Sequence, residues 1–155
     1  MKKLDFGQTL HLLGNVGVVI GIFLLVYELN QNREMMQAQT RNEISQAVAT
    51  MLFEITSDRE YANINFRGDK GEELTELESY QYLGSMLAQF RLNENVHYQY
   101  RNGLYDEFEF AAQKNTWRVR FADKGIAKLW CAVQAGFSPE FAAEINGLLT
   151  TYKCE

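Results

Sequence analysis

Glu94 and His97 form a pair whose residue types and spacing are typical of a metal site. Side chains three residues apart share a face of a helix, and Glu-x-x-His supplies ligands in carboxylate-bridged di-iron bundles. Such a site needs a second Glu-x-x-His and two further carboxylates, whereas the only other histidine is His11. We therefore interpret Arg91, Glu94 and His97 as a polar cluster between helices or on a solvated face. We expect no metal, no cofactor and no catalytic residue.

The net charge and the motifs of the sequence argue against several classes of protein. The chain of 155 residues carries a net charge of −5, whereas a dedicated nucleic-acid binder shows a basic face. The sequence contains no Gly-rich phosphate loop and no Gly-x-Ser-x-Gly nucleophile motif. We therefore expect a protein that is not an enzyme and has no nucleic-acid partner.

The sequence contains two cysteines, Cys131 and Cys154. One pair is too few for a disulfide framework or for a structural zinc site. Cys131 lies in an apolar stretch, so we expect it to be a small core residue. Cys154 lies near the end of the sequence, and we expect it to be free. Free cysteines suit a reducing compartment.

The longest apolar stretch, LHLLGNVGVVIGIFLLVYEL, occupies residues 10–29. A hydrocarbon core about 30 Å thick needs roughly 20 helical residues. Residues 12–27 include no charged residue, and a lone segment in lipid must be a helix because its backbone groups have to pair internally. We therefore predict a tail at residues 1–9, a transmembrane helix at residues 10–29 and a helical soluble domain at residues 30–155.

Two other interpretations of this stretch fit the sequence less well. Lys2 and Lys3 precede it, as in a secretory signal peptide, but no small-x-small cleavage site follows Val26. A core helix of a soluble protein is usually apolar on one stripe only, whereas this stretch is apolar all round. An uncleaved, single-pass anchor in contact with the lipid bilayer fits better than either.

Gly14, Asn15, Gly17 and Gly21 lie in the first half of the predicted span. Gly-x-x-x-Gly places two small residues on one face, which lets two membrane helices approach closely. Asn15 favours a hydrogen bond between helices at that depth. The alternative is that glycine is simply commoner in membrane helices than in soluble ones. We predict that these residues form a homo-oligomer interface.

The segment after the span is rich in amide side chains, including Asn30, Asn32, Gln37 and Gln39. Residues 30–57 contain no Gly and no Pro, and apolar residues recur at helical spacing from Ile44 onward. We therefore expect the span to continue into a long stem helix. Its amides form either a solvated face or a polar stem that bundles with copies of itself.

Start and stop signals divide the remainder into short helices at residues 58–66, 76–102, 107–121, 124–135 and 139–151. Thr75 and Glu78 form a capping box, Gly103 ends the second of these helices, and Ser138 followed by Pro139 opens the last one. No strand alternation occurs. We predict an all-α fold, with one transmembrane helix, a stem helix and a small helical bundle domain.

Apolar positions at helical spacing give the expected buried faces. For residues 76–102 these are Leu77, Tyr80, Leu83, Gly84, Leu87, Phe90 and Val96. For residues 107–121 they are Phe108, Ala111, Ala112, Val119 and Phe121. These sets assume that each helix buries one continuous stripe.

The order of features resembles a widespread family of small uncharacterised bacterial single-pass membrane proteins with an all-helical soluble domain. The matching segments are residues 14–29, Gln31-Asn32, Tyr98-x-Tyr100-x-x-Gly103-Leu104-x-Asp106-Glu107 and Phe137-Ser138-Pro139-Glu140-Phe141. The resemblance implies a bacterial inner-membrane location and a cytoplasmic domain, because such relatives carry basic residues just after the span. This chain differs in carrying Lys2 and Lys3 before it. The resemblance implies no activity.

Three hypotheses for the function remain open. The first is a non-enzymatic, membrane-anchored scaffold or partner-binding module that self-associates. The second is a homo-oligomeric pore lined by the span and by stem amides such as Asn30 and Asn32. The third is a membrane-anchored enzyme that uses Arg91, Glu94 and His97 in a pocket.

Overall fold

The computed structural model describes residues 6–150 and 152–154, and this part of the chain is helical with no strand. The all-α prediction is therefore confirmed. The chain divides into two compact units, one up to Ala38 and one from Gln39 onward. Each unit is described by itself below.

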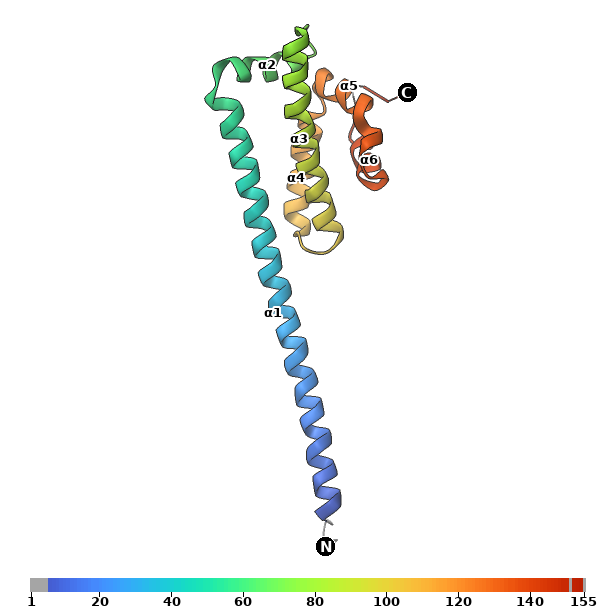
Figure 1. Ribbon diagram of the computed structural model, residues 1–155. Helices are drawn as coiled ribbons and strands as arrows, with labels where there is room; N and C mark the ends of the chain where they lie inside the picture. The colour runs from blue at the N-terminus through green and yellow to red at the C-terminus, as the bar shows by residue number, and fades with distance from the viewer. Residues whose placement is uncertain (1–5, 151, 155) are drawn as a thin grey trace. The chain divides into compact units, whose positions relative to one another are not determined.

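Helix α1 runs from Phe6 to Ser57 as one continuous α-helix (Figure 1). The prediction that the apolar stretch continues into a stem helix is confirmed. Of the predicted tail, residues 1–5 lie outside the described part, and the helix begins before residue 10. No proline occurs before Pro139, so nothing in this stretch removes a backbone donor from the helix.

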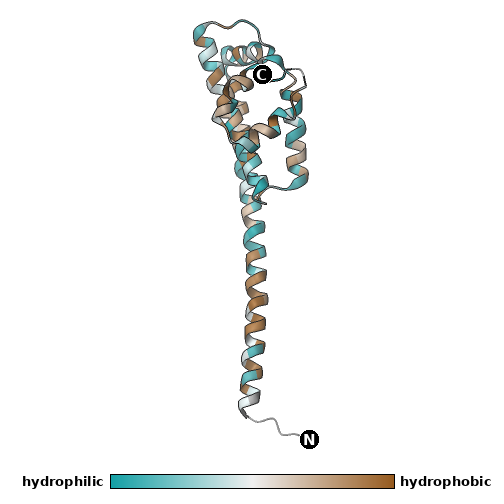
Figure 2. Ribbon diagram, turned by 90° about the vertical axis from the view of Figure 1, so that its right-hand side faces the viewer, coloured by the Kyte–Doolittle hydropathy of each residue, from teal (hydrophilic) through white to brown (hydrophobic). Residues whose placement is uncertain are grey.

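The apolar part of α1 is exposed all round. Its large apolar side chains between Leu10 and Leu29 are between 48% and 71% exposed, and Figure 2 colours this part of the helix as hydrophobic. Within the described chain this surface has no apolar partner. It is the one helix in the described residues that is long and apolar enough to cross a membrane.

The second unit is a small helical bundle. After the end of α1 come five α-helices and one short 3₁₀ helix: α2 (Arg59–Lys70), α3 (Glu76–Arg101), α4 (Glu107–Arg120), α5 (Lys124–Val133), η1 (Gln134–Gly136) and α6 (Pro139–Asn146). Helices α3 and α4 pack side by side and run in opposite directions (Figure 1). Helix α2 contacts both α3 and α5.

Side-chain caps fix several of these boundaries. The Thr75–Glu78 capping box has both of its reciprocal hydrogen bonds, as predicted. The Asp106 carboxylate accepts hydrogen bonds from the backbone N–H groups of Phe108 and Glu109. Gly103 follows α3 with φ of 70°, a conformation that favours glycine. The sequence therefore predicted this boundary for the right physical reason.

Two predicted boundaries were wrong. Helix α2 continues to Lys70 and ends at Gly71, whose φ is 74°, beyond the predicted end at residue 66. Helix α6 ends at Asn146, although the sequence predicted a helix as far as residue 151. The chain turns after Asn146 because Leu148 and Leu149 both enter the core.

The core of this unit is aromatic. Trp130 is fully buried and lies edge-on to Phe90, Phe121 and Phe141, with ring centroids 5.3, 6.0 and 5.5 Å away. Edge-to-face pairs of this kind add to the stabilisation from burial. Because the four rings come from α3, from the end of α4, from α5 and from α6, this cluster holds those elements together.

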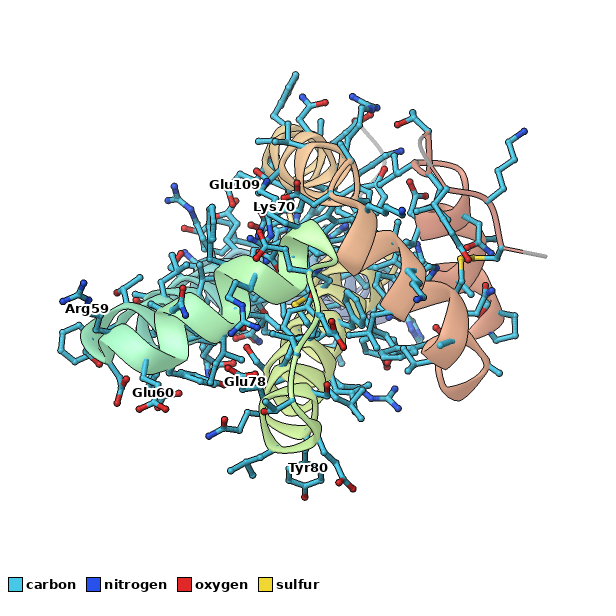
Figure 3. All side chains as sticks on the ribbon, turned by 90° about the horizontal axis from the view of Figure 1, so that it is seen from above. Arg59, Glu60, Lys70, Glu78, Tyr80 and Glu109 are labelled. Carbon is cyan, nitrogen blue, oxygen red and sulfur yellow. A yellow bond between two sulfur atoms is a disulfide. The ribbon has the colours of Figure 1, made fainter. Side chains whose placement is uncertain are left out.

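The predicted buried faces of α3 and α4 were only partly correct. Phe90, Val96 and Phe121 are buried, but Leu77, Tyr80, Phe108 and Val119 are between 69% and 85% exposed. Figure 3 shows Tyr80 pointing away from the domain. The residues that α3 and α4 bury in their place are Tyr82, Met86, Phe110 and Trp117. Both helices carry large apolar residues on more than one face, so spacing alone did not identify the buried one.

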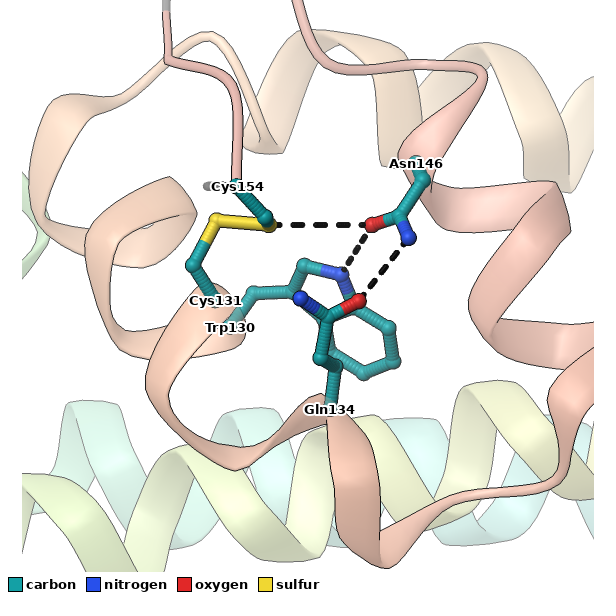
Figure 4. The surroundings of a disulfide bond; sticks show 5 residues. All are labelled: Trp130, Cys131, Gln134, Asn146 and Cys154. Atoms are coloured by element: carbon teal, nitrogen blue, oxygen red, sulfur yellow. Dashed lines mark hydrogen bonds between the residues drawn. A yellow bond between two sulfur atoms is a disulfide. The ribbon is translucent and has the colours of Figure 1, made fainter.

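The two cysteines are joined, which contradicts the prediction that Cys154 is free. A disulfide links Cys131 to Cys154 across a sequence separation of 23 residues (Figure 4). Beside it, Trp130 Nε1 donates a 2.9 Å hydrogen bond to Asn146 Oδ1, and Asn146 Nδ2 donates one to Gln134 Oε1. The bond holds the end of the chain against α5.

Helices α2 and α5 approach each other closely where each carries a glycine residue. A Cβ on Gly125 would lie 1.8 Å from the backbone oxygen of Gly68, and one on Gly68 would lie 2.5 Å from the Tyr82 ring. The two backbones are therefore closer than any larger residue permits.

This close approach gives a stability prediction. We expect Gly125→Ala to lower the free energy of unfolding by about 3 kcal/mol, because α2 and α5 must separate to admit the new methyl group. Gly84→Ala is the matched control. Gly84 lies in α3, and a Cβ there meets nothing within 4 Å among the described residues. It should raise stability by about 0.5–1 kcal/mol through helix propensity.

Urea unfolding of the full chain in a membrane mimetic, followed by tryptophan fluorescence, measures both changes. Equal effects of Gly125→Ala and Gly84→Ala would contradict the close packing of α2 on α5.

Candidate functional site

The predicted polar cluster is split between two environments. Arg91 Nη1 pairs with Glu94 Oε2 at 2.6 Å, and Arg91 Nη2 donates a 2.8 Å hydrogen bond to the Gly136 carbonyl. The Arg91 guanidinium also lies 4.1 Å from the ring centroid of Phe137. Arg91 therefore fastens α3 to the turn before α6.

Glu94 also binds the turn before α6. Its Oε1 accepts a 2.7 Å hydrogen bond from the backbone N–H of Ser138, at the start of α6. Burial alone would raise the pKa of Glu94, but the hydrogen bonds from Ser138 and Arg91 outweigh it and hold the pKa below its usual value. A carboxylate held ionised in this way caps a helix, which is a structural role.

His97 is placed differently. It is 6% exposed and lies between the rings of Phe110 and Phe141, with centroids 6.0 and 5.8 Å away. Burial lowers its pKa, so the imidazole is neutral near pH 7. All three predicted residues border one surface hollow, but only Arg91 and Glu94 form a pair. Residues 6–150 and 152–154 contain no grouping of side chains suited to a metal ion.

The predicted interface residues of the span lie on an open helix surface. A Cβ added at Gly14, Gly17 or Gly21 would meet no atom of the described chain within 4 Å. Asn15 is exposed beside them. The face is therefore free of other parts of the described chain, and a second helix could approach it.

The predicted stem amides are also near or at the surface. Asn30, Asn32 and Gln39 are exposed, and Gln37 is half-buried. Gln39 Nε2 donates a 2.7 Å hydrogen bond to Glu43 Oε1 one turn on. Gln39 is therefore satisfied within α1, and its pairing with a second chain stays a prediction.

A groove that the sequence did not predict lies in the second unit. It encloses ≈ 390 Å³ between the last turns of α1 and helices α2, α3 and α4. Its walls are mainly apolar and include Met51, Ile55, Phe66, Met86, Phe90 and Trp117. This volume falls in the range of small-molecule sites.

One side of the groove carries a part-buried ionic pair. Arg120 Nη1 lies 3.0 Å from Asp69 Oδ2, and Arg120 Nη2 donates a 3.1 Å hydrogen bond to Gln89 Oε1. The Tyr82 hydroxyl donates to the other Asp69 oxygen at 3.1 Å. Burial raises the pKa of Asp69 although the neighbouring Arg120 charge opposes the shift. The pair joins α2 to α4, and Arg120 Nε remains buried without a hydrogen-bond partner among the described residues.

Further amide side chains line the same groove. Asn65 is engaged, because its Oδ1 accepts a 2.7 Å hydrogen bond from Ser85 Oγ and its Nδ2 donates to the Tyr61 carbonyl. Asn93 is 8% exposed and borders the groove. In the described part of the chain its side chain has no hydrogen-bond partner, whereas the fully buried side-chain nitrogen without a partner is Arg120 Nε. Nothing in the sequence distinguished Asn93 from the exposed Asn95 beside it.

A comparison of the chain with protein-family models, curated proteins and solved structures finds no match in any of the three. The interpretation of the groove and of the apolar helix therefore depends on the chain's own chemistry.

The buried imidazole gives a pH prediction. The unfolded chain binds a proton at His97 near the ordinary histidine pKa of about 6.5, whereas the folded chain binds it only at a lower pH because its pKa is lowered. Protonation therefore favours the unfolded state, and stability should fall as the pH drops from about 6.5 toward the folded pKa. The slope for one group is at most about 1.4 kcal/mol per pH unit.

Urea unfolding from pH 8 to pH 5 measures this slope, with His97→Gln as the comparison. The raised pKa of Asp69 acts in the opposite direction, and it cancels in the difference between the two proteins. We expect His97→Gln to be less stable at pH 8 but to lose less stability on acidification. Parallel pH profiles would contradict a buried, neutral His97.

Proposed function

We propose that this protein is a single-pass membrane-anchored module that self-associates through its span and presents its helical domain for binding, without catalysing a reaction. The observation that carries the proposal is the apolar part of α1. Its most apolar window has a mean hydropathy of 2.2, and none of that window is buried within the chain. Each Leu, Ile, Val or Phe moved from water into hydrocarbon is stabilised by about 1.5–3 kcal/mol. Lipid is the environment that covers such a helix on every side.

The glycine face supports self-association. Hydrophobic burial does not drive helices together inside lipid, so close packing and hydrogen bonds must do so. Gly14, Gly17 and Gly21 leave room for a second backbone, and Asn15 offers a hydrogen bond beside them. The partner that we propose for this face is a second copy of the same helix.

The disulfide indicates the side of the membrane on which we propose that the helical domain lies. Disulfides persist in oxidising compartments and are rare in the cytosol. Two basic residues, Lys2 and Lys3, precede the span, and two others, Arg33 and Arg41, follow it closely, so the count of basic residues favours neither orientation. The Cys131–Cys154 disulfide favours an N-terminus inside and a helical domain outside. This orientation is the reverse of the cytoplasmic domain that the family resemblance implies, and the bacterial inner membrane is the setting in which we propose it.

Self-association through the span is testable with one substitution. We expect Gly17→Leu to weaken the dimer or larger oligomer at least tenfold, because the leucine side chain prevents close approach of the two helices. Val19→Leu is the matched control, since it adds bulk on another face of the same helix. Fluorescence energy transfer between labelled chains in lipid vesicles, over a range of protein-to-lipid ratios, measures the affinity. A wild-type chain that stays monomeric at all ratios would overturn this part of the proposal.

A further inference from the structure

We propose that the groove between α1, α2, α3 and α4 binds an uncharged single-chain amphiphile, with its apolar tail along the groove and an amide or hydroxyl head at Asn93. This site is separate from the span and independent of the proposed self-association. Its occupant is inferred from the shape, wall chemistry and polar groups of the groove.

The walls select an apolar tail. Leu52 and Phe66 line the groove and remain 56% and 61% exposed, so water covers apolar surface that a ligand would remove from water. Met51 and Met86 also line it, and methionine adapts its shape to irregular apolar ligands. The walls come from helices that are distant in sequence, so the folded domain is needed to form them.

The ionised side chains that line the groove disfavour a ligand with a charged head group. Asp69 and Arg120 are the ionisable residues among those that line the groove, and they already pair at 3.0 Å. Together they carry no net charge when both are ionised. A carboxylate head would compete with Asp69 for Arg120, and a cationic head would compete with Arg120 for Asp69. An uncharged head leaves this part-buried pair intact and so avoids the cost of separating its two charges.

Asn93 supplies the polar contact. The residue is 8% exposed and borders the groove, and its side-chain amide has no hydrogen-bond partner among the described residues. An amide offers both donors and an acceptor. A ligand amide or hydroxyl can satisfy both kinds of group at once, and the half-buried Gln113 borders the same groove.

The volume limits the size of the ligand. A groove of ≈ 390 Å³ lies toward the small end of the range for small-molecule sites. A chain of about ten carbons with a small head matches this volume. N-(2-hydroxyethyl)decanamide is therefore a suitable probe, and decanoate and decyltrimethylammonium are charged comparators with similar tails.

Photolabelling of the full chain in lipid nanodiscs tests the site. A diazirine-bearing form of N-(2-hydroxyethyl)decanamide is cross-linked, and the labelled residues are identified by mass spectrometry. We expect saturable labelling of groove residues such as Met51 and Trp117, reduced at least fivefold by excess unlabelled amide and less than twofold by either charged comparator. Labelling confined to residues 10–29, or labelling that does not saturate, would overturn the proposal, as would equal competition by decanoate.

A matched pair of variants separates the polar contact from general effects. Asn93→Leu should weaken saturable labelling at least fivefold, whereas Asn95→Leu, at an exposed position of the same helix, should change it less than twofold. Thermal unfolding checks that both variants fold. Ile55→Trp, which fills the groove from α1, provides a second variant that leaves Asn93 in place. Unchanged labelling in a folded Asn93→Leu protein, or in Ile55→Trp, would contradict the assignment.

Discussion

An apolar helix with nothing in the described part of its chain to pack against is the constraint on which the rest of this protein depends. Between Leu10 and Leu29 the large side chains of α1 are at least 48% exposed. Backbone groups in lipid must pair within the segment, and an α-helix meets that requirement without a partner. The proposed lipid environment accounts for both the composition of this segment and its helical form. In the proposed oligomer, the glycine face is the surface at which two such helices meet.

The helical domain depends on a different interaction, the aromatic cluster around Trp130. Phe90 and Phe141 lie edge-on to its ring, and its indole N–H is satisfied by Asn146. The Arg91–Glu94 pair and the Cys131–Cys154 disulfide then fasten the turn before α6 and the end of the chain to this core. Phe90 and Phe121 of this cluster also line the groove.

Much of the fold could be predicted from the sequence because its signals are local. The capping box at Thr75 and Glu78, the glycine after α3 and the long segment without Gly or Pro each act within a few residues. The buried faces of α3 and α4 were harder to predict. Tyr80 and Tyr82 are of the same type and lie two residues apart, yet only Tyr82 has a buried partner, Asp69.

The candidate sites also divide into those with a local sequence signal and those without one. The glycine face and the Arg91–Glu94 pair are local in sequence, and the structure contains both. The disulfide and the Asp69–Arg120 pair join residues that are far apart in sequence, and no sequence motif predicts either pairing. The groove needs residues from five helices, and the low exposure of Asn93 beside it is known only from the folded chain. These features follow from tertiary packing, which single-sequence patterns do not specify.

The central claim is that residues 10–29 cross a membrane with the helical domain on its oxidising side. The most direct measurement labels intact bacterial spheroplasts expressing the chain with a membrane-impermeant maleimide, before and after a membrane-impermeant reductant. We predict a full-length chain that stays in the carbonate-washed membrane fraction and gains adducts at Cys131 and Cys154 only after reduction. Labelling without reduction, labelling only after lysis, release by carbonate, or a chain shortened at its N-terminus would contradict the claim.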